Sequence, residues 1–319
     1  MIIDFILQSF TTPAILFFIS GFLIGICGIV LEVPQSISQF LSLYLIAAIG
    51  FKGGHDFSSI SEWHSLLMLF AMSIIISLAI PFIAYRILRL VTTLDKPTAA
   101  ALSAHYGSVS IITFLTAESF LQSQCITYAG YLGAVLALME GPAIFSGIYL
   151  AKRNRDISKP IFGDIFRASG CLVLLLSTFF IGLVSSKADC LKMEGFFGTP
   201  FYGFLCFFLL DVGLLVGRQI NVIKKFTFGL IMFGIYMPLI GAFLGLLVAA
   251  WLGLDVGSAT LFMVLCASAS YVAVPAAMKI AIPEAKVAVY LPMALAITFP
   301  FNVIIGISLY YSIALQILG

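Results

Sequence analysis

Ser108-Val109-Ser110 and Ser268-Ala269-Ser270 are matching triplets of small residues that lie 160 positions apart, each inside a long hydrophobic segment. Small hydroxyl residues that interrupt two corresponding hydrophobic segments indicate helices that unwind at membrane depth. The freed backbone groups and helix ends of such a break face a substrate or an ion. The two triplets therefore predict a duplicated chain with two broken helices, an arrangement typical of transporters.

The composition places the chain in the membrane. Hydrophobic residues make up 62% of the 319 positions and charged residues 9%, and the mean hydropathy is +1.16. This leaves too little polar surface to coat a water-soluble globule, so the chain is expected to be a polytopic membrane protein in a lipid bilayer. No nucleic-acid partner is expected. Residues 12–31 are long enough to span and lack a clear cleavage site, so we expect a retained first helix and not a signal peptide.

A span of about 20 residues divides the chain into ten helices. The stretch 151–169 is the only long charged connection, and it separates a first five-helix half (1–150) from a second (170–319). The fold class expected is an all-α polytopic membrane protein. The expected helices are 12–31, 36–52, 64–90, 97–122, 126–150, 170–187, 196–217, 226–252, 257–281 and 286–316.

Basic residues predict the orientation, because short cytoplasmic loops are rich in Lys and Arg. Thirteen of the 16 Lys and Arg residues follow the third, fifth, seventh and ninth helices, whereas Lys52, Lys187 and Lys192 lie in the opposite loops. Both termini are therefore expected outside, with 151–169 in the cytoplasm. Five helices in each half make the second half enter the membrane from the opposite side, so the two repeats are inverted.

Other matched features occur in the same order in both halves, which supports the duplication. Two glycine-rich helix ends correspond, two prolines occupy the fifth helices, and a glycine follows each proline. The matched pairs are Ile49-Gly50-Phe51-Lys52-Gly53-Gly54 with Val212-Gly213-Leu214-Leu215-Val216-Gly217, Glu140-Gly141-Pro142 with Phe299-Pro300-Phe301, and Gly147 with Gly306.

On these residues the chain resembles the sodium-dependent bicarbonate transporters of cyanobacteria and their bacterial relatives, over essentially its whole length. The resemblance implies a bacterial inner-membrane protein whose fourth and ninth helices are broken and cross at mid-membrane. It also implies a core domain of helices 3–5 and 8–10 and a gate domain of helices 1, 2, 6 and 7, through which a homotrimer forms. The motifs that carry it are Ile49–Gly54, Gly107-Ser108-Val109-Ser110-Ile111-Ile112-Thr113, Met139-Glu140-Gly141-Pro142, Ala267–Pro275 and Ile282-Pro283.

The chemistry of the crossing follows from the breaks. The start of each second half-helix exposes N–H groups that favour an anion, while unwound carbonyls favour a cation. Compact hydroxyls suit a small oxyanion such as bicarbonate. The alternative is that these hydroxyls bond their own helix carbonyls or pack between helices. The predicted substrate-binding residues are Gly107, Ser108, Val109, Ser110, Thr113, Ser268, Ala269 and Ser270.

A carboxylate inside the membrane is a site candidate by default, because its charge is costly there. Glu140 matches an acidic residue of the family and is expected to bind Na⁺ or carry a proton; capping of the proline-disturbed backbone is the alternative. The coupling-ion set that we predict is Glu140, Ser110, Ser270, Tyr271 and Thr298.

Some positions depart from the family pattern. Tyr271 stands where characterised members have Asp, Ala273 replaces a hydroxyl residue, and Ile111-Ile112 replaces a small pair. The resemblance implies Na⁺-coupled bicarbonate symport, which is the function that we expect. The departures are the reason for the alternative, an H⁺- or Na⁺-coupled carrier of another small (organic) anion. No cofactor is expected beyond the coupling ion.

An intramembrane enzyme and a non-transporting sensor or scaffold are two other classes of membrane protein. An intramembrane enzyme needs a nucleophile or metal dyad, and the chain has no HExxH, GxSxG or GxGD-type acidic pair. The sequence has no P-loop, so the chain is not expected to hydrolyse nucleotide itself, and we expect an ion gradient to drive transport. It has no His, Cys and acidic residues at metal-ligand spacing, so the only metal ion expected is Na⁺. A non-transporting sensor or scaffold would keep the fold and bind without transport. The resemblance also implies a PII-like regulator at 151–169, with a lipid-contacting tether as the favoured alternative.

Overall fold

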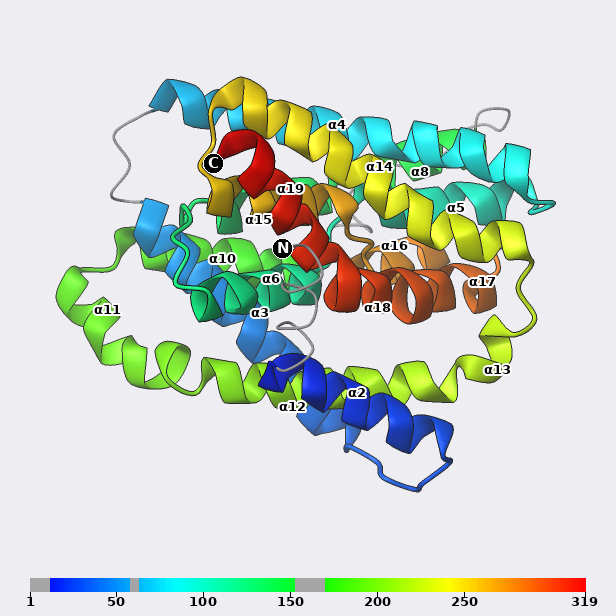
Figure 1. Cartoon of the computed structure of the whole chain (residues 1–319), viewed down its shortest axis with the longest axis horizontal. Coiled ribbons are helices and arrows are strands. Elements are labelled where there is room, and N and C mark those ends of the chain that lie inside the picture. Colours follow the sequence, from blue (N-terminus) through cyan, green and yellow to red (C-terminus); the bar gives the residue numbers. More distant parts are fainter. Residues whose placement is uncertain (1–11, 58–62, 153–169) are drawn as a thin grey trace.

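The computed structural model describes residues 12–57, 63–152 and 170–319, which form helices joined by turns, with no β-strand among them (Figure 1). Three π-helical turns, η1 to η3, interrupt the helices. In chain order the elements are α2 (Pro13–Ile26), α3 (Gln35–Phe57), α4 (Trp63–Val91), α5 (Lys96–Gly107), α6 (Ile111–Ser123), α7 (Leu132–Glu140), α8 (Pro142–Lys152), α10 (Gly170–Val184), α11 (Lys187–Met193), η1 (Glu194–Gly198), α12 (Phe201–Arg218), α13 (Ile220–Ile223), α14 (Phe228–Leu252), α15 (Val256–Ala267), α16 (Ala273–Ala281), α17 (Val287–Pro292), η2 (Met293–Thr298), α18 (Phe299–Phe301), η3 (Asn302–Gly306) and α19 (Ile307–Leu318).

The helices are membrane-spanning in length and composition. Among the described residues, seven helical stretches are long and apolar enough to cross a bilayer. Pro13–Ile26, Val173–Val184 and Val256–Ala267 are shorter apolar helices. The protein is therefore an all-helical, multi-pass membrane protein.

Four predicted helix boundaries were wrong by about a turn or more. The second helix continues to Phe57 instead of ending at 52, so Lys52 lies inside α3 and not in a loop. The first helix ends at Ile26 instead of 31, because Gly28 turns the chain with φ +69°. The fifth starts at Leu132 instead of 126, because the N–H of Ala129 is donated outside the helix, to Ser258. The helix expected from 196 is preceded by α11 and η1, which begin at Lys187. Residues 153–169 of the predicted linker, with the proposed regulator site, lie outside the described residues.

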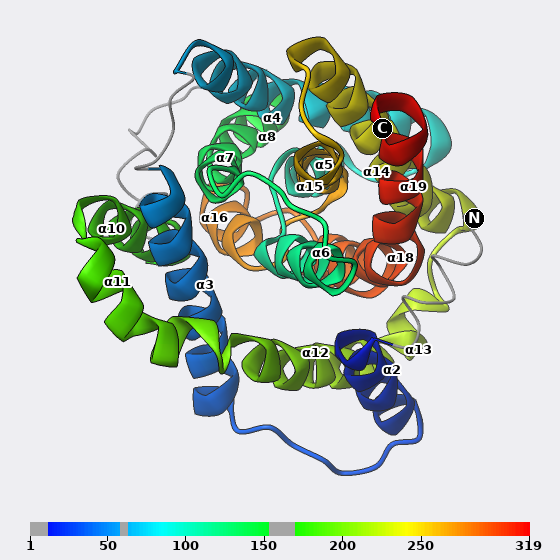
Figure 2. The same cartoon turned by 60° about the vertical axis from the view of Figure 1, so that its left-hand side comes forward.

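The helices separate into a flanking layer and a bundle, as Figure 2 shows. The flanking layer consists of α2, α3, α10, α11 and α12, along the left and lower sides of that view. The bundle contains α4 to α8 and α14 to α19. In the flanking layer α2 packs on α12 and α3 on α10, so each half of the sequence supplies one helix to each pair.

Glycines let these paired backbones approach closely. A Cβ on Gly213 of α12 would overlap the carbonyl oxygen of Phe18 in α2. A Cβ on Gly54 of α3 would likewise overlap the carbonyl oxygen of Phe179 in α10. Small residues at helix interfaces are the usual means of close packing in lipid, where helices gain no hydrophobic driving force from each other.

In the bundle, α5 and α15 are equivalent helices, 160 residues apart in sequence. Each begins after an aspartate N-cap. Asp95 accepts the N–H of Thr98 at 3.4 Å, and Asp255 accepts that of Ser258 at 2.9 Å. An N-cap carboxylate satisfies one of the free N–H groups at a helix start and favours its positive end. The same local chemistry therefore starts both helices.

The two halves also complete each other's caps. The hydroxyl of Thr98 accepts the backbone N–H of Lys286 at 3.0 Å, and the hydroxyl of Ser258 accepts that of Ala129 at 2.9 Å. Lys286 precedes α17 in the second half, and Ala129 precedes α7 in the first. Each half thus supplies a connecting loop that is tied to a helix start of the other half.

We expect Gly213→Ala to lower the stability of the purified protein by about 1–3 kcal/mol, because the added Cβ overlaps backbone that cannot move without separating α2 from α12. Gly203→Ala, also on α12, is the matched control, since no atom lies within 4 Å of its added Cβ. Thermal unfolding in detergent measures both variants. Equal melting temperatures for the two would contradict close packing at Gly213.

Candidate functional site

The first break separates α5 from α6. Helix α5 ends at Gly107, Ser108 and Ser110 are extended, and α6 begins at Ile111. The Ser110 hydroxyl caps α6, accepting the N–H of Thr113 at 3.3 Å and its hydroxyl at 2.9 Å. Ser108 donates its hydroxyl to the carbonyl oxygen of Glu140 at 3.0 Å. The first break is therefore joined to the end of α7.

The second break separates α15 from α16. Helix α15 ends at Ala267, Ser268 is extended, and α16 begins at Ala273. The Ser268 hydroxyl donates to the carbonyl oxygen of Leu265 at 3.1 Å. The Ser270 hydroxyl accepts the N–H of Val274 at 3.4 Å. Both serines of this triplet therefore use their hydroxyls to close exposed backbone.

The two breaks are hydrogen-bonded to each other. The N–H of Ser110 is donated to the hydroxyl of Ser268 at 2.8 Å, and the N–H of Ser270 to the carbonyl oxygen of His105 at 2.9 Å. All four residues are at most 3% exposed. Residues about 160 positions apart in sequence thus satisfy each other's backbone groups inside the bundle, where no water is available.

Small residues let neighbouring helices reach both breaks. A Cβ on Gly107, just before the first break, would overlap the ring of Pro81 in α4. On the other side, a Cβ on Gly241 of α14 would overlap the carbonyl of Cys266, next to the second break. Pro81 and Gly241 are 160 positions apart, as are Gly107 and Ala267. At the first break the glycine is on the broken helix and the larger residue, Pro81, is on the neighbouring helix. At the second break the glycine, Gly241, is on the neighbouring helix.

A small cavity of about 10 Å³ lies at the crossing and opens between the breaks and α3. That volume holds about one water molecule, so a molecule of the size of bicarbonate does not fit in this conformation. The lining residues are Ser42, Ile46, Val109, Ser110, Ile111, Ile112, Glu140, Ser270, Tyr271 and Val272.

Glu140 is the acidic residue of this cavity. Its side chain is 2% exposed, and its Oε2 atom has no hydrogen-bond partner among the described residues. Burying an ionised carboxylate without a partner costs several kcal/mol, roughly, so such a group calls for a cation or a proton. Tyr271 packs edge-on against Phe299, with ring centroids 5.5 Å apart, and forms another wall.

The predicted site residues divide by the roles of their side chains. Val109, Ser110, Glu140, Ser270 and Tyr271 line the cavity. The other predicted residues do not line the cavity. Thr298 lies in η2, and the rest lie at the breaks. These are Gly107, Ser108, Thr113, Ser268 and Ala269.

Thr298 occupies a different environment, in η2. Its hydroxyl pairs with the Tyr106 hydroxyl at 2.7 Å and donates to the carbonyl oxygen of Gly234 at 2.9 Å. In this conformation the hydroxyl therefore joins α5, α14 and η2, and it is not a lining group of the cavity.

Sequence reasoning missed Ser42 and Ile46, the two residues that α3 contributes to the cavity. One serine in an apolar helix is a weak signal, because serine is also common at helix interfaces. His105 received only a minor place as a candidate, because a lone histidine just before a break is more often structural; in the structure it bonds the second break.

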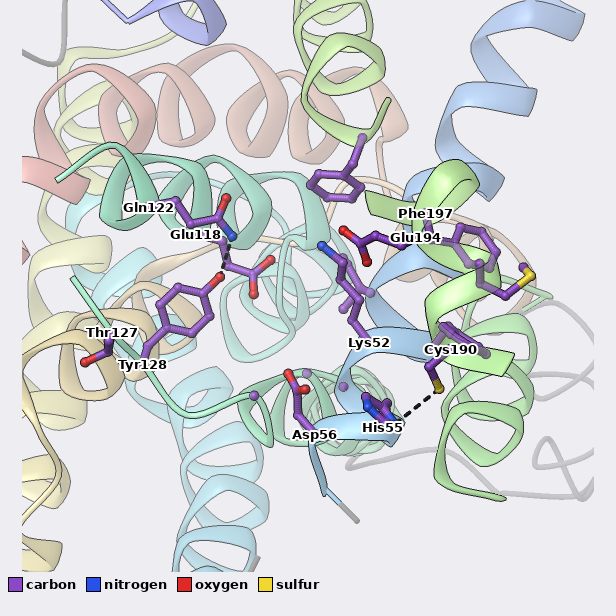
Figure 3. A pocket seen from close by; sticks show the side chains of 17 residues that line it. Lys52, His55, Asp56, Glu118, Gln122, Thr127, Tyr128, Cys190, Glu194 and Phe197 are labelled. Carbon is purple, nitrogen blue, oxygen red and sulfur yellow. Dashed lines mark hydrogen bonds between the residues drawn. The ribbon is translucent and has the colours of Figure 1, made fainter. Parts of the chain in front are cut away.

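A second, larger cavity of about 440 Å³ lies between the flanking layer and the bundle (Figure 3). Its charged lining residues are Lys52 and Asp56 of α3, Glu118 of α6 and Glu194 of η1. The Lys52 ammonium lies 5.5 Å from the centre of the Phe201 ring, a cation–π contact. Because α3 lines this cavity with Ile49 and the small cavity with Ile46, one helix leads from the first to the second.

A sequence model of the Na⁺-dependent bicarbonate transporter superfamily matches residues 13–315. The matched range contains both breaks and Glu140, and it confirms the resemblance found in the motifs. No curated protein matches the chain.

We expect Ser268→Ala to destabilise the protein by about 1–3 kcal/mol, because the buried N–H of Ser110 loses its acceptor. Ser312→Ala is the matched control: Ser312 is also buried, but its hydroxyl donates only to Ser308 within α19. Thermal unfolding in detergent compares the two variants. A loss for Ser312→Ala as large as that for Ser268→Ala would contradict a special role of the crossing bond.

Proposed function

Because the chain belongs to the Na⁺-dependent bicarbonate transporter superfamily, it is a membrane transporter of a small anion and not an enzyme, and we propose that it moves bicarbonate by symport with Na⁺. The observation that carries the proposal is the crossing itself. Two helices begin there, α6 and α16, beside a cavity that also contains a buried carboxylate.

The helix starts suit the anion. Ile111 and Ile112 are the first two residues of α6, where N–H groups lack partners within the helix and carry partial positive charge. Ser110 and Ser270 add hydroxyls to the same cavity. These groups match the planar oxygens of bicarbonate, and Val109 lines the same cavity. We assign Gly107, Ser108, Thr113, Ser268 and Ala269 to holding the breaks in shape around them.

Glu140 gives the reason for coupling. An anion and the Glu140 carboxylate repel each other in a cavity that excludes water, because the effective dielectric constant there is low. A Na⁺ ion between them removes that repulsion, so the two ions bind together or not at all. Glu140 and the hydroxyls of Ser110, Ser270 and Tyr271 supply oxygen ligands; Thr298 joins the set only after its present hydrogen bonds open.

We propose ten transmembrane helices in two inverted five-helix repeats, 1–150 and 170–319. The exchanged pairs α2 with α12 and α3 with α10 support this architecture, as do the exchanged loop-to-cap bonds at Thr98 and Ser258. The bundle corresponds to the predicted core domain and the flanking layer to the predicted gate domain.

Transport then requires the core domain to slide or rock against the gate domain, since the small cavity is too narrow for the substrate. The 440 Å³ cavity lies between these two units and serves as the outer vestibule, in which Lys52 is the cationic lining residue beside the carboxylates of Asp56, Glu118 and Glu194. We place this cavity on the outer side because the distribution of basic residues in the loops predicts that both termini are outside. We also propose that the protein forms a trimer through the gate domain in a bacterial inner membrane.

The first test is uptake of labelled bicarbonate into proteoliposomes under an inward Na⁺ gradient, an inward H⁺ gradient, or neither. We expect only the Na⁺ gradient to stimulate uptake, and we expect the double variant Ser110→Ala with Ser270→Ala to lower it by about tenfold or more through two lost hydrogen-bonding groups. Stimulation by the H⁺ gradient alone would show that H⁺, and not Na⁺, is the coupling ion. Binding without uptake in sealed vesicles would favour a sensor, and absence of both would reject bicarbonate.

Glu140→Gln tests the coupling. The amide keeps the size of the side chain but removes the charge that Na⁺ compensates, so we expect uptake to lose its dependence on the Na⁺ gradient. Glu32→Gln, at an exposed position, is the control and should behave as the unmodified protein. Na⁺-stimulated uptake retained in Glu140→Gln would show that the carboxylate is not part of the ion site.

A further inference from the structure

His105 holds the second break through two hydrogen bonds to one residue. It lies in the last turn of α5 and is 0% exposed. Its carbonyl oxygen accepts the N–H of Ser270 at 2.9 Å, and its ring Nδ1 lies 2.5 Å from the carbonyl oxygen of Ser270. Both peptide groups that flank the Cα atom of Ser270 are therefore hydrogen-bonded to His105, one by its backbone and one by its ring.

The partners determine which ring nitrogen carries the proton. A carbonyl oxygen only accepts hydrogen bonds, so Nδ1 must be the donor and Nε2 the bare nitrogen of a neutral ring. Nε2 is buried and has no hydrogen-bond partner among the described residues. Leaving an acceptor unpaired costs free energy, so an imidazole is a poor choice at this position for packing alone.

The other half of the chain shows what packing alone would select. The residue 160 positions after His105 is Leu265, in the last turn of α15. Leu265 donates no side-chain hydrogen bond to the first break, where the N–H of Ser110 is instead donated to the hydroxyl of Ser268. The ring of His105 is itself oriented by Tyr290, whose ring centroid lies 4.9 Å away. The first break is thus held by a hydroxyl of the second break, whereas the second break is held by an imidazole in the last turn of α5.

We propose that His105 is a positioning residue for substrate binding. By holding both peptide groups of Ser270, it keeps the Ser270 hydroxyl in the cavity and in reach of the Val274 N–H at the start of α16. The inference rests on the proposed function in one respect, that Ser270 contacts the transported anion. The hydrogen-bonded link between the two broken helices does not depend on that assignment.

Two substitutions separate the hydrogen bond from the packing. His105→Asn places an amide N–H near the position of Nδ1, whereas His105→Leu introduces the residue found at position 265 and has no donor. Hydrogen exchange of peptides covering 268–275 in the purified protein reports on the link directly. Peptides covering 287–292, which include Tyr290, report on ring packing. Bicarbonate uptake gives KM and the maximal rate.

With His105→Leu we expect exchange in 268–275 to accelerate, and KM to rise, by about tenfold, the effect of losing one buried hydrogen bond. His105→Asn should stay within about twofold of the unmodified protein in both measurements. Unchanged exchange and KM in His105→Leu would overturn the proposal. The proposal would also be overturned if His105→Asn changed exchange and KM as much as His105→Leu does while the protein remained monodisperse. The same holds if exchange accelerated only in peptides covering 287–292.

Failure of transport and failure of this link are distinguishable. If the unmodified protein takes up no bicarbonate, the proposed function is rejected, while the exchange of 268–275 in the two variants still decides whether His105 holds Ser270.

Discussion

Every backbone N–H and C=O group buried in lipid needs a partner inside the protein, and this requirement governs the centre of the molecule. Breaking α5–α6 and α15–α16 frees peptide groups where no water can reach them. The structure satisfies them by bringing the breaks together, with Ser110 bonded to Ser268 and Ser270 to His105. Neither break is stable alone, so the site exists only because two distant segments meet.

The packing around the crossing follows from the same requirement. Bonds between the breaks need helices at close range, and Gly107 and Gly241 remove the side chains that would keep α4 and α14 away. The loops before α7 and α17 are tied to the starts of α15 and α5. The bundle therefore holds the two broken helices at both their outer ends and their interruptions.

Electrostatics distinguishes the site from its scaffold. Most hydroxyls near the breaks are committed to backbone partners, whereas Glu140 presents an oxygen with no hydrogen-bond partner among the described residues. Helix starts that favour an anion and a carboxylate that favours a cation share one cavity. A pair of opposite charges satisfies this cavity better than either ion alone, which gives symport a physical basis. The cavity is narrow here, so binding requires the bundle and the flanking layer to move relative to each other.

The sequence alone determined what depends on local composition. Its hydropathy established a multi-pass helical membrane protein, and the matched small-residue triplets Ser108–Ser110 and Ser268–Ser270 gave the positions at which α5 and α15 end. Helix ends were less accurate where a distant residue decided them: Ala129 lies outside α7 because Ser258 binds its N–H.

The tertiary structure decided which of the polar side chains face the cavity. Ser110 and Ser270 line it, but Ser108 turns to the Glu140 carbonyl and Thr298 to Tyr106 and Gly234. Ser42 enters from α3, and His105 bonds Ser270 across the repeat. A hydroxyl or imidazole has several partners of similar strength, and the choice depends on helix rotation and on neighbours far away in the chain. Sequence pattern records which groups can bond, whereas only the packed helices select the partner.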